Sequence, residues 1–213
     1  MRLFYFLSLL ILGQYSSLFS QNYYMPEETE EHEGTWLQWP HHHTYGYLYR
    51  DDLDQTWLDM TAALVESENV HIIAYNLTEQ NRIIALLNSE NIPLDNINFN
   101  IKENDDVWVR DNGPMFVYDE NDVLHMVDWG FNGWGNDTPY ELCDAVPSYL
   151  SNQINVPVID LSTVVLEGGA IEHDGHGTMM ATRSSVTHSS RNKKGAPNEA
   201  PFVYQFKLFL VDS

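Results

Sequence analysis

The sequence predicts an α/β protein whose strands pair in mixed or antiparallel fashion, rather than in a doubly wound parallel sheet. Segments with strand-like and helix-like apolar spacing alternate along the chain, and short turn sequences typical of hairpins separate some of the strands. The expected order is strand–helix–strand–helix–strand–hairpin–helix–strand–hairpin. The chain has 213 residues, of which 43% are hydrophobic, which suffices for one domain with a sizeable core.

Strands and helices are expected to alternate in the first half of the chain. Strands are predicted at residues 35–39, 70–75 and 97–101, from their β-rich or alternating apolar composition. Residues 52–66 predict a helix, and a second helix is expected to be capped by Thr78. The apolar positions at helical spacing are Leu53, Trp57, Met60, Ala63 and Leu64 in the first helix and Ile83, Ile84 and Leu87 in the second.

Two hairpins are expected in the second half. A short buried strand at Val107–Val109 is predicted to be broken sharply by Asn112-Gly113-Pro114. The remaining predicted elements are a hairpin at 115–118 and 123–129, a helix at 139–150 interrupted near Pro147, strands at 156–160 and 164–166, and a second hairpin at 171–174 and 178–182.

The composition is strongly acidic. Lysine and arginine together number 10 against 31 aspartates and glutamates, which gives a formal net charge of −21. Such a surface repels nucleic acids and anionic membranes, whose protein partners present basic side chains to phosphates. It attracts small cations or arginine- and lysine-rich segments, although high net charge also serves solubility alone. We therefore expect a cationic partner and no nucleic acid, and the oligomeric state stays open.

The first residues resemble a secretory signal. Arg2 precedes the apolar run Leu3–Leu12, which is too short to span a bilayer, and Ser20 is a small residue before a cleavage point at Gln21. Residues 1–20 are expected to direct export and to be removed, leaving no membrane association, with an uncleaved anchor as the alternative. The single cysteine, Cys143, forms no internal disulfide, so packing must stabilise an exported chain.

Two polar motifs lie at predicted strand ends. Asp111 belongs to the stretch N-D-D-V-W-V-R-D-N-G-P at 104–114, and a strand end is a common place for a catalytic or binding side chain. An ordinary turn built on a local aspartate is the alternative. Glu167 belongs to L-E-G-G-A-I at 166–171, directly after another predicted strand. The two motifs together favour a functional site.

Two further segments bear on ligand binding. The loop Phe131–Gly135 combines glycines, which let the backbone approach a ligand, with Trp134, which can cover it. The adjacent residues His41, His42 and His43 cannot all face one metal ion from a regular element, because neighbouring side chains diverge. We expect them to lie in a surface loop rather than in a metal site.

Four segments form a set: M-P-E-E-T-E-E-H-E-G-T-W-L-Q-W-P, W-V-R-D-N-G-P, D-W-G-F-N-G-W-G and L-E-G-G-A-I-E-H-D-G-H-G-T. In this order, between about Met25 and Asn192, they resemble the agmatine deiminase and bacterial-type peptidylarginine deiminase family. The resemblance implies a partial α/β-propeller of repeated β-β-α-β modules with mixed sheets. It also implies hydrolysis of a guanidinium C–N bond to a ureido product and ammonia, without a metal or an organic cofactor.

The resemblance assigns roles to individual residues. A guanidinium is a planar cation that two carboxylates can hold bidentately while a thiolate attacks its carbon and a histidine moves protons. Asp111 and Glu167 match the guanidinium-binding carboxylates of the family and its wider superfamily. Trp108 and Trp134 would line the pocket along the substrate's alkyl stem, with core packing as the alternative for both. The implied substrate is agmatine or an arginine side chain.

The family's nucleophilic cysteine and catalytic histidine are not recognised in this sequence. His173 belongs to the E-G-G hairpin, and Cys143 has acidic neighbours in a helix-like segment, where a small core residue is expected. Residues 193–213 show no likeness to the family. Residues 21–192 are therefore expected to be the N-terminal part of a deiminase domain, truncated, inactive alone and left with an open sheet edge. A non-catalytic guanidinium-binding module or a structural fragment is the alternative.

Overall fold

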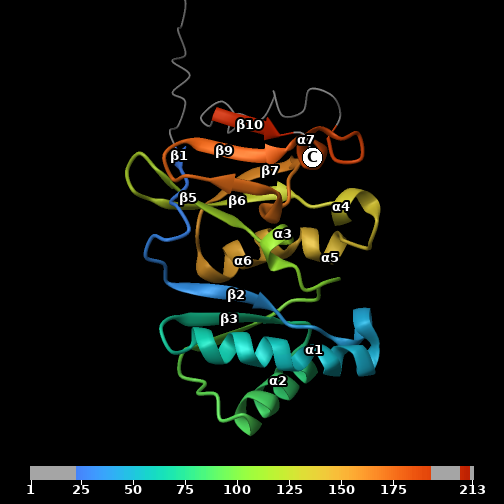
Figure 1. Ribbon diagram of the computed structural model, residues 1–213. Coiled ribbons are helices and arrows are strands. Elements are labelled where there is room, and N and C mark those ends of the chain that lie inside the picture. Colours follow the sequence, from blue (N-terminus) through green and yellow to red (C-terminus); the bar gives the residue numbers. More distant parts are fainter. Residues whose placement is uncertain (1–22, 193–206, 212–213) are drawn as a thin grey trace, which may run out of the picture.

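The computed structural model describes residues 23–192 and 207–211, which form three separate sheets with helices packed below and between them (Figure 1). Each sheet has three or four strands. One sheet is wholly parallel, whereas the other two combine parallel and antiparallel pairs. The predicted α/β class with mixed sheets is confirmed.

The first sheet contains parallel strands joined by helices. Strands β2 (Gly34–Gln38), β3 (Asn69–Ala74) and β4 (Ile97–Ile101) lie in that order, and helices α1 (His42–Leu64) and α2 (Leu77–Ser89) connect them. Both helices lie on the outer side of the sheet, away from the rest of the molecule (Figure 1). The three predicted strands are confirmed. Their shared core includes Leu37, Leu58, Val70, Ile72, Ile83 and Leu87.

Helix α1 is longer than predicted, and its inner face is more polar. It begins at His42 rather than at residue 52, and a kink at Gly46, whose φ is +68°, separates two helical segments. Ala63, predicted to face inside, is exposed. Charged residues that form ion pairs occupy inner-face positions where the apolar spacing predicts hydrophobic residues. The buried residues of the helix are Arg50, Asp54, Leu58 and Thr61.

The predicted surface loop of histidines is wrong. His41 is fully buried just before α1, where its Nε2 lies 3.2 Å from Asn104 Oδ1 and its ring centroid lies 4.3 Å from that of Tyr75. His43 is exposed. A hydrogen-bond partner from the segment that precedes Asp111 makes the burial of a histidine favourable, and a one-dimensional reading of the triplet cannot detect it.

The cap of α2 also differs from the prediction. The side-chain oxygen of Asn76 accepts a hydrogen bond from the backbone amide of Glu79 at 3.0 Å, which satisfies a free amide of the first helical turn. Thr78 lies inside the helix. Asparagine and threonine are both good caps, and the extended backbone of Asn76 decides between them.

The second sheet contains the first predicted hairpin. Strands β5 (Met115–Asp119) and β6 (Leu124–Gly130) pair antiparallel, β1 (Tyr23–Tyr24) adds to β5, and β7 (Val158–Val165) pairs parallel with β6. The single strand β7 replaces the two strands predicted at 156–160 and 164–166. A register shift beside Gly130 lets it continue past the irregular residues between them.

Two short helices follow β6 and its loop. Helices α5 (Glu141–Asp144) and α6 (Val146–Ile154) occupy the region of the predicted interrupted helix. The interruption falls at Ala145, and Pro147 lies in the first turn of α6, where its missing amide removes no helical hydrogen bond. A small core that joins this helix to the first two sheets contains Ile73, Met126, Val146 and Leu150.

The third sheet contains the second predicted hairpin. Strands β8 (Ile171–His173) and β9 (Thr178–Thr182) pair antiparallel, and β10 (Lys207–Val211) pairs parallel with β9. Helix α7 (Arg183–Thr187) follows β9. The core shared by the second and third sheets includes Met115, Val117, Val127, Leu161, Leu166, Ile171 and Met179.

The predicted signal at residues 1–20 lies outside the described residues, as does most of the segment 193–213. Strand β10 belongs to that segment, which we expected to fall outside the family. Among the helices that the structure describes, none is both long enough and apolar enough to cross a membrane. Export therefore stays a prediction.

Candidate functional site

The segment around Trp108 forms a helical turn instead of the predicted strand. Helix α3 (Val109–Asn112) follows Trp108, whose carbonyl oxygen accepts the backbone amides of Asp111 at 2.9 Å and Asn112 at 3.0 Å. The side-chain amide of Asn112 donates to the same carbonyl at 2.8 Å. These local hydrogen bonds outweigh the strand-like apolar pattern. Strand β5 begins directly after Pro114, and Asp111 lies on the helical turn rather than at the predicted strand end.

The glycine pair of the second motif packs directly on this turn. The 3₁₀ turn η1 (Gly168–Ala170) follows Glu167, and the backbone amide of Gly169 donates to Asp111 Oδ1 at 3.0 Å. A Cβ atom on Gly169 would lie 2.2 Å from that oxygen, and one on Gly168 would lie 2.2 Å from the carbonyl oxygen of Arg110. Only glycine therefore allows the two motifs to approach this closely.

The aromatic loop supplies a second donor to Asp111. Its turn α4 (Gly133–Asn136) has a left-handed backbone, with φ of +55° at Trp134 and +99° at Gly135. This backbone is uncommon for a bulky residue and costs about 1 kcal/mol or more. It places the indole Nε1 of Trp134 3.0 Å from Asp111 Oδ2 as a donor. Asp111 thus accepts one hydrogen bond on each carboxylate oxygen, which fixes its orientation.

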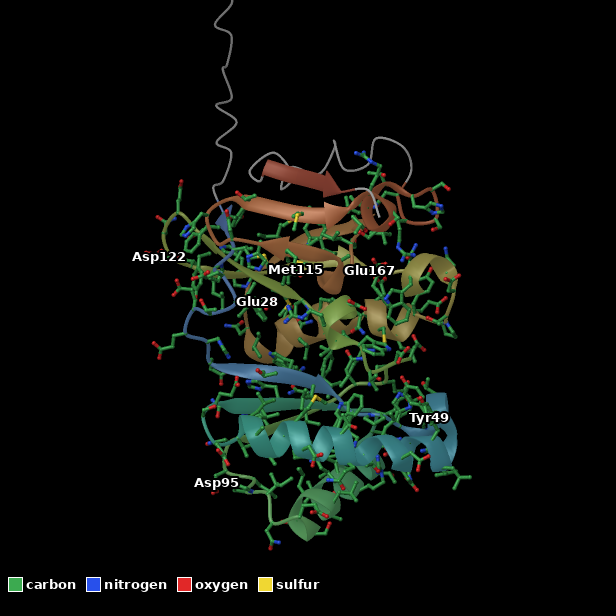
Figure 2. All side chains as sticks on the ribbon, viewed as in Figure 1. Glu28, Tyr49, Asp95, Met115, Asp122 and Glu167 are labelled. Carbon is green, nitrogen blue, oxygen red and sulfur yellow. The ribbon has the colours of Figure 1, made fainter. Side chains whose placement is uncertain are left out.

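Glu167 is the buried carboxylate of the site, and Figure 2 shows it in the middle of the molecule near Met115. The residue is 3% exposed, and Arg191 Nε lies 2.8 Å from its Oε1 as an ion pair. Neither of these two buried atoms has a well-aligned hydrogen-bond partner among the described residues. Burial raises the pKa of Glu167, the charge of Arg191 opposes that shift, and the charge of Asp111 adds to it. The negative charges of the two carboxylates therefore interact.

Three of the four predicted site residues come together, from α3, α4 and the start of η1: Asp111, Trp134 and Glu167. The fourth, Trp108, is 55% exposed on the same turn as Asp111. An exposed tryptophan beside carboxylates can cover the alkyl chain of a ligand. The oriented carboxylate and the buried carboxylate can together accept the donor fork of a planar cation.

Sequence reasoning missed Arg191 as a member of the site. Its charge pairs with Glu167 across a hairpin and a helix, and the sequence around it has no pattern that indicates burial. The only available signal was the acidic composition of the chain, in which a basic side chain has many potential partners. The hydrogen-bonding role of Trp134 was missed as well, because the prediction used only its apolar ring.

Cys143 is a core residue, as predicted. It has no exposed surface, its Sγ accepts the backbone amide of Asp105 at 3.3 Å, and burial raises the pKa of its thiol to about 11. The thiol therefore stays protonated at neutral pH and is a poor nucleophile. Across residues 23–192, no group of three or more histidine, cysteine, aspartate or glutamate side chains is arranged to hold a metal ion.

Sequence comparison relates this chain to known proteins. The profile of the Porphyromonas-type peptidyl-arginine deiminase family matches residues 24–201. An agmatine deiminase of Pseudomonas aeruginosa is 31% identical over 176 residues, which cover 79% of this chain and 45% of that protein. The chain spans about half the length of the curated relatives it matches.

Solved structures share the fold. A substrate-bound agmatine deiminase of C. jejuni matches with a TM-score of 0.74 and 25% identity, over 88% of this chain and 55% of that chain. The agmatine deiminase of Enterococcus faecalis matches with a TM-score of 0.77 and 24% identity, over 90% of this chain and 53% of that chain. The second likeness concerns the fold alone.

Proposed function

The chain belongs to the Porphyromonas-type peptidyl-arginine deiminase family, and on that premise we propose that Asp111 and Glu167 bind the guanidinium group of agmatine or of an arginine side chain. The reaction proposed for the protein is hydrolytic deimination. Water replaces one guanidinium nitrogen, which leaves as ammonia, and a ureido group remains. The three sheets are proposed to be modules of an α/β-propeller.

The observation that supports this proposal is that two carboxylates with different partners lie close together. Asp111 accepts hydrogen bonds on both oxygens, whereas Glu167 is buried beside one arginine. Asp111 is oriented by Gly169 and Trp134 and keeps further lone pairs for a ligand. Glu167 is 3% exposed, and its one ion pair among the described residues, between its Oε1 and Arg191 Nε, is poorly aligned for a hydrogen bond. A guanidinium supplies five N–H donors in a rigid plane, which suits two carboxylates better than an ammonium does.

Calorimetric titration of the full chain with agmatine tests the proposal. Asp111→Asn should weaken binding about 10- to 100-fold, because a hydrogen bond to a charged group contributes about 1.5–3 kcal/mol. Asp95→Asn is the matched control, since this exposed aspartate lies at the far end of the molecule from Glu167 (Figure 2). Butylamine, which lacks the guanidinium, should bind far more weakly than agmatine. Equal affinities for the two variants would refute the assignment of Asp111.

The second candidate function for this sequence by itself is to bind a guanidinium group without hydrolysing it. The one cysteine of the sequence is the buried, protonated Cys143, so it offers no accessible thiolate. Agmatine or an arginine-containing peptide incubated with the chain should release no ammonia above the buffer rate, even where titration shows binding. Sustained ammonia release would contradict this candidate and favour the hydrolase.

Substrate and location are proposed on narrower grounds. The loop Phe131–Gly135 carries no arginine of its own to pair with a substrate carboxylate, and Arg191, which lies against the loop, is paired with Glu167, so agmatine is favoured over an arginine side chain. Titration with agmatine and with an arginine-containing peptide separates the two, and a preference for the peptide would contradict this choice. Export through residues 1–20 is tested by finding the chain, shortened at its N-terminus, outside the cytoplasm.

A further inference from the structure

Arg191 lies in the segment that follows α7 and packs against the candidate site. Its Nε faces Glu167 Oε1 at 2.8 Å, and the two side chains are 14% and 4% exposed. Its Nη1 lies so close to the left-handed turn of the aromatic loop that a Cβ atom on Gly135 would be 2.4 Å away. One guanidinium therefore touches both the buried carboxylate and the loop that carries Trp134.

The neighbours of Arg191 hold the same two regions. Asn192 accepts the backbone amide of Val165 and donates to its carbonyl, each at 2.8 Å, which ties the segment to the strand just before Glu167. The carbonyl of Ser190 accepts the side-chain amide of Asn132 at 2.8 Å, at the base of the aromatic loop. The position of Arg191 is thus determined on both sides by hydrogen bonds.

We propose that Arg191 is a positioning residue of the guanidinium site, which keeps Glu167 charged and oriented and holds the aromatic loop so that Trp134 reaches Asp111. The inference rests on the proposed function for its effect on binding. Among the described residues, the charged groups that face Glu167 are Arg191, after α7, and Asp111, on α3. Arg191 opposes the repulsion between the two carboxylates, and without it Glu167 would take up a proton at higher pH.

Two measurements on the full chain test this inference. The first is the affinity for agmatine as a function of pH. In Arg191→Gln the loss of affinity on acidification should move to higher pH by about one unit, since an opposite charge nearby lowers a carboxylate pKa by about 1–3 units. The second is the indole N–H signal of Trp134 in a nitrogen-15 NMR spectrum, assigned by its absence in Trp134→Phe, which should move in Arg191→Gln. Arg183→Gln, an exposed arginine on α7, is the control and should change neither.

Arg191→Lys separates the two roles and serves if the glutamine variant does not fold. Lysine keeps the charge but loses the planar fork, so the pH profile should stay as in the wild type while the Trp134 signal moves. An unchanged indole signal in Arg191→Lys, or an unchanged pH profile in a folded Arg191→Gln, overturns the inference. If the wild type does not bind agmatine, the proposed function fails, and the indole signal alone still decides whether Arg191 positions the loop.

Discussion

Two glutamates are buried to the same extent but have different neighbours. Glu79 lies beneath the first sheet, and Glu167 lies in the candidate site. Each is 3% exposed. Glu79 accepts Arg82 Nε at 2.7 Å and Arg50 Nη1 at 3.1 Å, with His42 Nδ1 2.9 Å from the carboxylate. Burial alone would raise the pKa of Glu79, but these partners bring it below its ordinary value. The pKa of Glu167 lies above its ordinary value, because burial and Asp111 outweigh one arginine.

The contrast separates a structural charge from a candidate functional one. Glu79 joins a network in which Arg82 also pairs with Asp54, and Asp54 accepts the indole N–H of Trp39 at 2.8 Å. Such a network leaves little capacity for a ligand and ties α1 and α2 to the sheet. Glu167 has a single basic partner among the described residues, Arg191, in an ion pair that is poorly aligned for a hydrogen bond, and it lies next to a second carboxylate. Burial of a carboxylate therefore indicates a ligand only when its partners do not satisfy it.

Removing the well-paired glutamate should have the largest effect. Glu79→Ala leaves the buried Arg50 and the half-buried Arg82 without their shared partner, and we expect it to lower the free energy of unfolding by about 3–5 kcal/mol. Urea denaturation measures this effect. Glu90→Ala, an exposed glutamate just after the same helix, is the control. Losses of similar size in both variants would contradict the structural role assigned to Glu79.

Alanine substitutions at Gly168 and Gly169 should separate an effect on agmatine affinity from an effect on stability. In Gly169→Ala the added Cβ meets only the Asp111 carboxylate, which can swing away, so agmatine affinity should fall about 10-fold or more with little loss of stability. In Gly168→Ala the Cβ meets the backbone of Arg110, so stability itself should fall. Calorimetry and urea denaturation of both variants check the pair. A Gly169→Ala chain with unaltered affinity would show that the orientation of Asp111 is unimportant.

Asp128 extends the comparison to a carboxylate that faces like charges. Burial, and then Asp144 and Asp160, raise the pKa of Asp128 to about 6 from 3.8. The folded state therefore holds a proton that the unfolded state has lost, so stability falls as pH rises from about 4 to about 6. Asp128→Asn should flatten this slope and stabilise the chain at neutral pH by about 1–2 kcal/mol. Urea denaturation across this pH range measures it, and an unchanged slope would count against the shift.

The exposed pair beside the site should have the smallest effect. Glu28 Oε1 lies 2.6 Å from Arg110 Nη1, and the two side chains are 66% and 68% exposed. Glu28→Gln should change stability by less than about 0.5 kcal/mol, because water and salt screen such pairs. Agmatine affinity should change less than twofold. A larger loss of affinity, measured by calorimetry, would place Glu28 within the binding site.

Local pattern predicted much of this fold because hairpins and amphipathic helices depend on neighbouring residues. Strand β4 has the predicted limits, and both hairpins lie where alternating residues flank turn sequences. The pattern failed where polar hydrogen bonds decide, whether near in sequence or distant. Local hydrogen bonds form a helical turn at Val109–Asn112 in place of the strand predicted at Val107–Val109, and a distant partner, Asn104, accounts for the burial of His41.

The candidate site shows the same division. The sequence by itself determined its components, since the motifs around Asp111, Glu167 and Trp134 carry the family likeness. Only the tertiary structure decided how they meet: two glycines admit the Asp111 turn, a left-handed backbone aims Trp134, and Arg191 lies against Glu167. The physical reason is the separation along the sequence over which each interaction acts. Strand and turn preferences act between near neighbours, whereas a buried charge takes its pKa and its partners from whatever distant segments the fold packs beside it.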